Sequence, residues 1–348
     1  MLSLAEKQVT APLGNGLDGG LTDRLPVGEF RRRLLRWFRR QQRPLPWRRD
    51  ADPYRVWVSE IMLQQTRVAA VSERYRDFLR RFPAVQKLAR ARLASVLAAW
   101  SGLGYYRRAR ALHKAARQIV RAGRFPETAE EWQKLPGVGR YTAAAVASIA
   151  FHQPCAAVDG NVRRVLQRLL ARGDHAPERR KGVEHYWQIA QKLLSRAHPG
   201  DFNQAMMELG ATICLPATPQ CERCPVARWC GSRARTGTAA GRRKQAVRVQ
   251  QEIAYVLLTN SRDIYLVQRP PAAPLMPGMW ELPKANGSSG DAVLLRLRHA
   301  ITTTDYRVTI LKGGSADASG GKWVGPEQAS RLPLTGLARK VLRRFDII

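Results

Sequence analysis

The stretch LPGVGRYTA, residues 135–143, sets the predicted fold of the region around it. Helical patterns lie on both sides, so its Pro-Gly-Val-Gly sequence predicts a tight turn between two helices. Gly137 and Gly139 would let the backbone approach another molecule closely, and the free N–H groups at the start of the next helix suit a phosphate. An ordinary helix–helix turn is the better explanation of Pro-Gly alone. Both glycines together with Arg140 favour a helix-hairpin-helix element that binds DNA.

The chain is strongly basic, which indicates an anionic partner. Its 348 residues include 59 Lys and Arg against 27 Asp and Glu, a formal net charge of +32. Such an excess is costly in self-repulsion, so nucleic acid is the first candidate partner and an anionic membrane the second. A merely solvated basic surface is the alternative. Hydrophobic residues make up 45% of the chain, enough for real cores, and the length predicts two domains.

The N-terminus, the apolar runs and the cysteines predict a protein of the cell interior. The first twenty residues lack a charged-then-apolar leader, and the longest apolar run, around residues 143–151, is too short to cross a bilayer. Four of the five cysteines are clustered, unlike the dispersed sets of secreted disulfide frameworks. We therefore expect a soluble, intracellular protein that binds no membrane. We further expect a monomer in the bacterial cytoplasm, associated with the nucleoid.

The sequence changes character along its length. Beyond Phe30, apolar residues recur every three or four positions with arginines between them, which predicts helices in LARARLASVLAAW, YYRRARALHKAARQIV and VRRVLQRLL. Small and basic residues without an acid follow the cysteines and are typical of a flexible linker. The predicted segments are a loose arm at 1–28, a helical domain at 29–230, a basic linker at 231–249 and a smaller domain at 250–348.

The last hundred residues predict a mixed α+β domain. EIAYVLLTNSRDIYLVQR contains two apolar, β-branched runs around a polar turn, which indicates a hairpin. YRVTIL and GKWV indicate further strands, and PLTGLARKVLRRF a closing helix.

Four cysteines lie in CLPATPQCERCPVARWC, residues 214–230, with the spacing C-x6-C-x2-C-x5-C. Four reduced structural thiols rarely cluster in this way for packing alone. Zinc modules tend to use two close pairs, whereas four thiolates also suit a [4Fe–4S] cluster. The spacing by itself does not separate zinc from iron–sulfur. Either group would staple a loop whose Arg223 and Arg228 could face phosphates.

Two acidic residues are candidates for acid–base chemistry. Asp159 precedes the amphipathic pattern VRRVLQRLL, where a carboxylate accepts backbone hydrogen bonds and stays ionised. Glu60 lies in WVSEIML among apolar residues, where desolvation would raise its pKa and keep a proton available. Taken singly, an ordinary helix cap explains Asp159, and a capping or surface residue explains Glu60.

Together these motifs resemble the MutY-type adenine DNA glycosylases of the helix-hairpin-helix superfamily. The resemblance extends from about Phe30 to the end of the chain. It rests on LPWR, WVSEIMLQQTRV, GLGYYRRARALH, LPGVGRYTA, VDGNVRRVL, the cysteine spacing and QRPPAAPLMPGMWELP. It implies an all-α helix-hairpin-helix glycosylase domain and a smaller α+β, MutT/Nudix-like C-terminal domain. It also implies a [4Fe–4S] cluster, bound by the following four residues: Cys214, Cys221, Cys224 and Cys230.

The resemblance assigns roles around the two acids. It implies that Glu60 is the general acid that protonates adenine and that Asp159 stabilises the oxocarbenium ion, electrostatically or through a transient covalent bond. Tyr141 and Asn161 match positions that orient and assist this pair, and Glu208 matches a further acid near the site. The related endonuclease III branch has a lysine where Tyr141 stands, so we expect base removal without efficient strand cleavage.

The resemblance also assigns DNA contacts. Gln65, Leu103 and Tyr105 match residues that enter the gap left by the flipped base. Tyr105 could equally be helix core on the sequence alone. Phosphate contacts are expected from the hairpin at Gly137, Gly139 and Arg140 and from the cysteine loop at Arg223 and Arg228, so binding should weaken steeply with salt.

The C-terminal domain is expected to sense 8-oxoguanine opposite the adenine. A Nudix hydrolase needs clustered glutamates for magnesium, but no Glu-Glu pair follows Glu281, so we expect no pyrophosphatase activity. The family often has Phe-Ser-His in the lesion loop, where this chain has Ile301-Thr302-Thr303. Thr302 can still supply a hydroxyl group.

The predicted function is removal of adenine opposite 8-oxoguanine, and more slowly opposite guanine, in duplex DNA. The alternatives are a bifunctional pyrimidine glycosylase/lyase and a non-enzymatic DNA-binding protein of the same fold. The missing lysine and the second domain speak against the lyase, and the presence of both Glu60 and Asp159 speaks against the binding protein.

Overall fold

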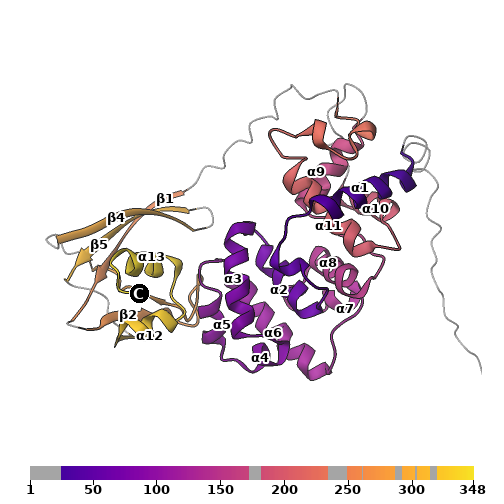
Figure 1. Cartoon of the computed structure of the whole chain (residues 1–348). Coiled ribbons are helices and arrows are strands. Elements are labelled where there is room, and N and C mark those ends of the chain that lie inside the picture. Colours follow the sequence, from indigo (N-terminus) through magenta and orange to yellow (C-terminus); the bar gives the residue numbers. More distant parts are fainter. Residues whose placement is uncertain are drawn as a thin grey trace, which may run out of the picture. The chain divides into compact units, whose positions relative to one another are not determined.

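The structure is a computed structural model (Figure 1). Its described residues fall into two compact units. One unit lies within residues 1–43 and 152–240, and the other within 44–151 and 241–348. Each unit thus combines two segments that are far apart in the sequence. The described residues are 25–171, 182–233, 249–260, 262–286, 292–301, 304–313 and 320–348.

The first unit is a group of helices that holds the cysteine segment. α1 and α9 both pack against α11, and α10 packs against α9. The ring of Phe30 lies 6.3 Å from that of Phe202 on α11 and 6.0 Å from that of Trp229 in the cysteine segment. These rings join the cysteine segment to the helices. The elements are α1 (Val27–Gln41), α9 (Gly160–Leu169), α10 (Val183–Leu193), α11 (Pro199–Thr212) and the short 3-10 helices η2 (Cys221–Arg223) and η3 (Ala227–Trp229).

The helical part of the second unit is built around α2 and α8. α8 carries a run of buried small residues, TAAAVAS, so α2 can pack closely against it. α4 and α5 pack on α6, and Trp57, Trp100 and Trp132 are fully buried. The elements are η1 (Pro46–Arg48), α2 (Pro53–Leu63), α3 (Val68–Arg81), α4 (Val85–Arg90), α5 (Leu93–Ala99), α6 (Arg107–Ala122), α7 (Ala129–Gln133) and α8 (Arg140–Phe151).

The C-terminal part contains two three-stranded sheets. In one sheet β5 is central, paired in parallel with β1 and antiparallel with β4. In the other, β2 is central and pairs antiparallel with both β3 and β6. The elements are β1 (Val249–Leu257), β2 (Ile264–Gln268), β3 (Trp280–Glu281), β4 (Ala292–Ile301), β5 (Thr304–Lys312), β6 (Gly321–Val324), α12 (Pro326–Arg331) and α13 (Gly336–Arg344).

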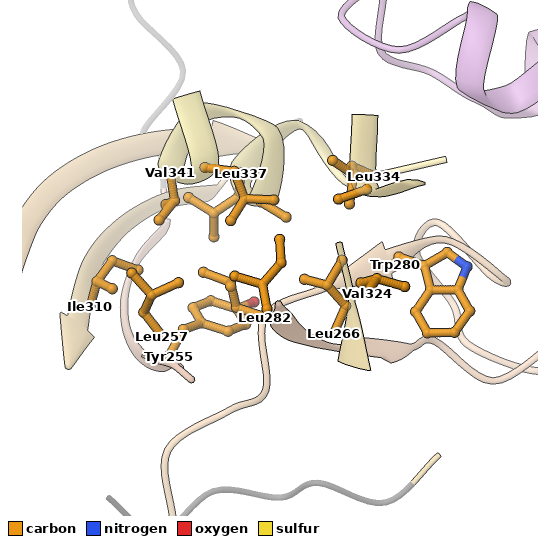
Figure 2. Close-up of a cluster of buried hydrophobic side chains, with 14 of the residues drawn as sticks. Tyr255, Leu257, Leu266, Trp280, Leu282, Ile310, Val324, Leu334, Leu337 and Val341 are labelled. Carbon is orange, nitrogen blue, oxygen red and sulfur yellow. The ribbon is translucent and has the colours of Figure 1, made fainter. Parts of the chain in front are cut away.

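An aliphatic core holds these strands and α13 together. Figure 2 shows Leu337 and Val341 of α13 above Leu257, Ile310 and Leu282 from the strands and their connections. Burying such side chains contributes about 1.5–3 kcal/mol each relative to exposure, so this part has a hydrophobic core of its own.

The predicted fold class is confirmed: a helical domain is followed by a smaller α+β domain. YYRRARALHKAARQIV covers most of α6, VRRVLQRLL covers most of α9, GKWV is β6 and PLTGLARKVLRRF contains α13. LARARLASVLAAW covers the end of α4 and all of α5, with a break at Ala91 and Arg92, where the backbone is extended. No helix in the described part of the chain is both long and apolar enough to cross a membrane.

The predicted hairpin between β1 and β2 forms only at its turn, because the two strands belong to different sheets. The polar turn does form, since Asn260 N–H donates to the Asp263 carbonyl at 3.0 Å. However, β1 pairs along its whole length with β5, and an isolated bridge between Thr259 and Ile264 joins the two predicted partners. The buried end of β1 thereby packs among the buried residues of β5, a long-range pairing that the local sequence does not report.

Most of the predicted N-terminal arm and linker lie outside the described residues, and α1 already begins at Val27. The predicted domain boundaries therefore stay predictions.

Candidate active site and nucleic-acid interface

Asp159 is held firmly at the start of α9. Its Oδ1 accepts from the Val162 N–H at 2.7 Å, as an N-cap residue does, and its Oδ2 accepts from the Asn161 side-chain amide at 2.9 Å. Burial raises the pKa of Asp159, and these two hydrogen bonds lower it again. Both oxygens thus have a fixed orientation.

The chain that leads into Asp159 is fixed as well. The N–H of Ala156 donates to Gln191 Oε1 at 2.8 Å, and that of Ala157 donates to Asn203 Oδ1 at 3.0 Å. The Asn203 amide donates in turn to the Cys155 carbonyl at 2.9 Å. Side chains of α10 and α11 therefore provide hydrogen-bond partners for the backbone of this buried, extended segment.

A hydrogen-bond chain links Asp159 to the cysteine segment. Arg164 Nη2 donates to Asn161 Oδ1 at 2.9 Å and to the Gly210 carbonyl at 2.6 Å, while its Nε donates to the Cys214 carbonyl at 2.9 Å. A Cβ atom on Gly210 would lie 2.7 Å from Asn161 Cβ, so glycine is needed where α11 approaches α9. Arg164 thus supports the residue that orients Asp159.

The cysteine segment is held against α9 by a second arginine one turn later. Arg168 lies 3.2 Å from Cys214 Sγ and donates to the Leu215 and Pro216 carbonyls at 2.7 and 2.8 Å. Its own carbonyl accepts from Cys230 Sγ at 3.4 Å. The sequence analysis did not single out Arg164 or Arg168. In the sequence, their spacing of four residues places them on the same face of one predicted helix, and this was the signal that could have identified them.

The four thiols of the cysteine segment interact with one another electrostatically. Burial raises the pKa of Cys221, Cys224 and Cys230, to about 12 for Cys224, and electrostatic interactions couple all three to Cys214. All four thiols are free of disulfides. Half-buried thiols that interact electrostatically are compatible with a positively charged group that binds thiolates. Within the described residues, no group of three or more His, Cys, Asp or Glu side chains is arranged to hold a single metal ion.

Glu60 occupies different surroundings in the other unit. It lies in the last half of α2, whose start is capped by Asp52, with Pro53 in the first turn. Its side chain is only 6% exposed and its neighbours Ser59 and Ile61 are buried. The predicted desolvation is therefore confirmed. Glu60 and Asp159 belong to different units, so their pairing stays a prediction.

The predicted hairpin lies between α7 and α8. Gly137 has a φ of +78°, and a Cβ atom there would lie 2.6 Å from Ala111 Cβ, so both conformation and packing require glycine. Gly139 has neither constraint, because a Cβ atom there would meet nothing within 4 Å. Arg140 is exposed at the start of α8, and Tyr141 is half-buried beside it. Internal packing thus explains why residue 137 is glycine. It does not explain Gly139, whose backbone another molecule could approach.

The predicted inserting residues lie on two loops. Gln65 follows α2 and Tyr105 precedes α6, and both have left-handed backbones, with φ of +57° and +47°. Such conformations cost about 1–3 kcal/mol each for residues other than glycine. Tyr105 is 50% exposed, which excludes the helix-core alternative, and Gln65 is exposed too. Leu103 is 4% exposed, so its side chain could enter DNA only after the loop moved.

Several predicted site residues already have ionic or polar partners within the protein. Glu208 is 1% exposed, and its two oxygens accept from the guanidinium of Arg43 at 2.8 and 2.7 Å. This pair joins the end of α1 to α11, which gives Glu208 a structural role. Arg228 pairs with Glu29 at 2.9 Å and lies over the Trp229 ring.

The remaining positions lie in the cysteine segment and in the C-terminal domain. Arg223 is exposed and donates to Gln220 Oε1 at 2.6 Å. In the C-terminal domain Glu281 is buried and bound by Arg269, with two contacts of 2.8 Å. Thr302 lies outside the described residues, next to Ile301, which pairs with Thr304 at the β4–β5 end.

Comparison with known proteins defines the class of this helical region. Residues 58–192 match the family model of the HhH-GPD superfamily of base excision DNA repair proteins. The fold is similar to that of a thermostable thymine-DNA glycosylase, with a TM-score of 0.55 and 29% identity over 60% of this chain and 97% of that one. An endonuclease III bound to DNA shares the fold at a TM-score of 0.51 and 24% identity, over 61% of this chain and 98% of that one. Residues 58–192 therefore have the fold of the HhH-GPD superfamily.

The similar sequences include adenine DNA glycosylases, which confirms the resemblance to the MutY-type proteins. The chain is 49% identical to the adenine DNA glycosylase of Rattus norvegicus over 227 residues, 62% of this chain and 44% of that protein. It is 46% identical to that of Homo sapiens over 249 residues, 68% of this chain and 43% of that protein. The chain thus spans less than half the length of these two relatives.

Proposed function

We propose that this protein is a DNA N-glycosylase of base excision repair that removes adenine from duplex DNA. Its substrate is adenine opposite 8-oxoguanine, with slower removal opposite guanine. The observation that carries this proposal is the fixed Asp159 carboxyl group, which has both oxygens hydrogen-bonded at the start of α9. The buried Glu60 and the similarity to adenine DNA glycosylases support it.

The two carboxyl groups divide the chemistry between them. Glu60 donates its proton to a ring nitrogen of the flipped adenine, and the bond from the sugar to the base then breaks with its electron pair going to the base. Asp159 stabilises the positive charge that develops on the sugar. Water adds to the sugar carbon and returns a proton to Glu60. Because Tyr141 replaces the lysine of the lyase branch, no Schiff base forms and the strand is not cleaved efficiently.

Residues around the pair assist it. Asn161 orients Asp159 through its amide, and Tyr141, in the first turn of α8, assists from the hairpin side. Glu208 supports this region through its ion pair with Arg43.

The cysteine segment is proposed to hold a [4Fe–4S] cluster. Cys214, Cys221, Cys224 and Cys230 would bind it, and the cluster would supply iron–thiolate bonds that fix the loop. Arg168 and Arg164 connect this loop to α9. Iron analysis and a visible absorption band of the purified protein test this proposal. Stoichiometric zinc without iron would overturn it.

Binding of duplex DNA is proposed to use three surfaces. Phosphates are contacted by the hairpin at Gly137, Gly139 and Arg140 and by the exposed Arg223. The protein binds the duplex as a monomer. Gln65 and Tyr105 fill the gap left by the flipped base. The α+β domain, with Thr302 in its lesion loop, reads the 8-oxoguanine. Arg228 is bound to Glu29, so it contributes less than Arg223.

A single-turnover assay tests the function most directly. Duplexes would carry adenine opposite 8-oxoguanine, guanine or thymine, and release of the free base would be measured with and without later alkaline cleavage of the strand. We expect rapid release opposite 8-oxoguanine, slower release opposite guanine and intact strands before alkali. Release of a pyrimidine with strand cleavage would favour the lyase, and binding without release would favour a DNA-binding protein.

A further inference from the structure

Arg108, one residue into α6, reaches back to the end of the helix that carries Glu60. Its Nη1 atom lies 2.9 Å from both the Ile61 and Met62 carbonyl oxygens and also contacts the Gln64 carbonyl. The last carbonyls of a helix have no intrahelical partner, and a cation suits them. Arg108 therefore closes the C-terminal end of α2 and the loop that begins there.

The other side of the same guanidinium binds the second loop. Its Nη2 atom donates to Thr66 Oγ1 and the Leu103 carbonyl at 3.0 Å and to the Gly104 carbonyl at 3.3 Å. Thr66 Oγ1 also donates to the Leu103 carbonyl at 3.4 Å. One planar cation thus joins two loops that are 37 residues apart in the sequence.

The environment of Arg108 is suited to this fixed position. Its guanidinium lies 5.5 Å from the centre of the Trp100 ring and 5.4 Å from that of Tyr105. Burial lowers its pKa to about 10, so it remains charged at neutral pH. Arginine offers a rigid fork of donors that lysine lacks, and this fork matches carbonyls arriving from two directions.

The two loops share one unusual property. Each places an exposed side chain on a left-handed backbone, at Gln65 and at Tyr105. Residues other than glycine stay in that conformation only where their surroundings fix it, and Arg108 binds the backbone next to both.

We propose that Arg108 is a positioning residue that fixes Gln65 and Tyr105 as a pair for insertion into DNA. The inference rests on the proposed function, because it takes adenine extrusion as the step that the pair serves. Arg108 touches neither the base nor the sugar. A purely structural arginine would support folding and all substrates alike, whereas this one supports the step that opens the stack.

The experiment compares two duplexes that differ only in the cost of extrusion. Both carry adenine opposite 8-oxoguanine, and in one of them the flanking base pairs are mismatched so that the adenine is already poorly stacked. With Arg108→Ala, we expect single-turnover release from the paired duplex to fall about 100-fold, the penalty typical of a misplaced group. Release from the mismatched duplex should fall by less than about threefold, because little unstacking remains to be driven. Arg108→Lys should lie between Arg108→Ala and the unmodified protein on the paired duplex.

Arg121→Ala is the matched control, since it removes an exposed arginine from the last turn of the same helix. It should change both rates by less than about twofold. If Arg108→Ala fails to fold by circular dichroism, Thr66→Val removes the hydroxyl shared by the two loops and should slow only the paired duplex, by about fivefold.

Equal losses on both duplexes, or no loss on either, would overturn the inference. No adenine release from either duplex by the unmodified protein would instead overturn the proposed function.

Discussion

The two carboxyl groups of the proposed mechanism have opposite surroundings. Asp159 starts a helix, and donors from Val162 and Asn161 bind both of its oxygens. Glu60 lies inside α2, a helix with buried residues on nearly every side. Burial raises the pKa of Asp159, and its two hydrogen bonds offset part of that rise. In the proposed mechanism the hydrogen-bonded Asp159 therefore acts as the anion and the buried Glu60 as the proton donor. The predictions below test this contrast, beginning with the largest effect.

Asp159→Asn should lower the single-turnover rate of adenine release by about 10⁴-fold, because it removes the negative charge that faces the oxocarbenium ion. Asparagine is also a good N-cap, so α9 should remain folded and mispair binding should be largely intact. Gel-shift titration alongside the rate measurement separates binding from chemistry. Normal turnover by this variant would refute the proposed mechanism.

Glu60→Gln should slow release by about 10³-fold, within the range for loss of a general acid. Glutamine has nearly the same shape and no charge to bury, so the melting temperature should stay the same or rise. A clear fall in melting temperature would mean that Glu60 is ionised and paired in the native state, which would remove the contrast with Asp159.

Arg164→Met should slow release about tenfold and lower the free energy of unfolding by ~2 kcal/mol, since it breaks hydrogen bonds from a charged donor to Asn161, Gly210 and Cys214. The control is Arg163→Met, because Arg163 is the exposed neighbour on the same helix. Chemical denaturation and single-turnover rates should leave the control close to the unmodified protein. Equal effects of the two substitutions would show that the hydrogen bonds linking Asp159 to the cysteine segment contribute neither to stability nor to adenine release.

The smallest effect is a change in pH dependence. The pKa of Asp159 is raised on folding, so the native state binds more protons than the unfolded state at pH values between the ordinary pKa, near 3.9, and the folded one. The contribution of this residue to the free energy of unfolding therefore falls as the pH rises through that window, and it is most favourable at the acid end. Denaturation of Asp159→Asn across this window should lack that contribution. An unchanged slope would mean that the hydrogen bonds cancel the effect of burial.

Local features of the fold were predictable from the sequence. Helix α9 follows from an apolar stripe, its N-cap from Asp159, and the hairpin turn from Gly137. These features depend on residues within one or two turns of each other, so the pattern reports them directly. The parallel pairing of β1 with β5 was not predictable in this way, because about fifty residues separate the partners and each strand alone fits several neighbours.

The contacts of long arginine side chains at the proposed site could not be predicted from the sequence either. Arg108, Arg164 and Arg168 look like solvated positions on amphipathic helices when the sequence is considered alone. In the structure they bind backbone carbonyls of distant loops. A long flexible side chain can reach a surface or a buried acceptor from the same helical position, and only the packing of other elements decides which it finds.

The sequence by itself determined the helical class, the hairpin, the capped Asp159, the desolvated Glu60 and the four-cysteine segment, because short-range spacing and residue chemistry encode each of them. The tertiary structure alone decided that Arg43 binds Glu208, that Arg228 binds Glu29, and that one guanidinium connects the loops of Gln65 and Tyr105. Those contacts join residues far apart in the chain. Their energies therefore depend on how the helices pack rather than on any local pattern.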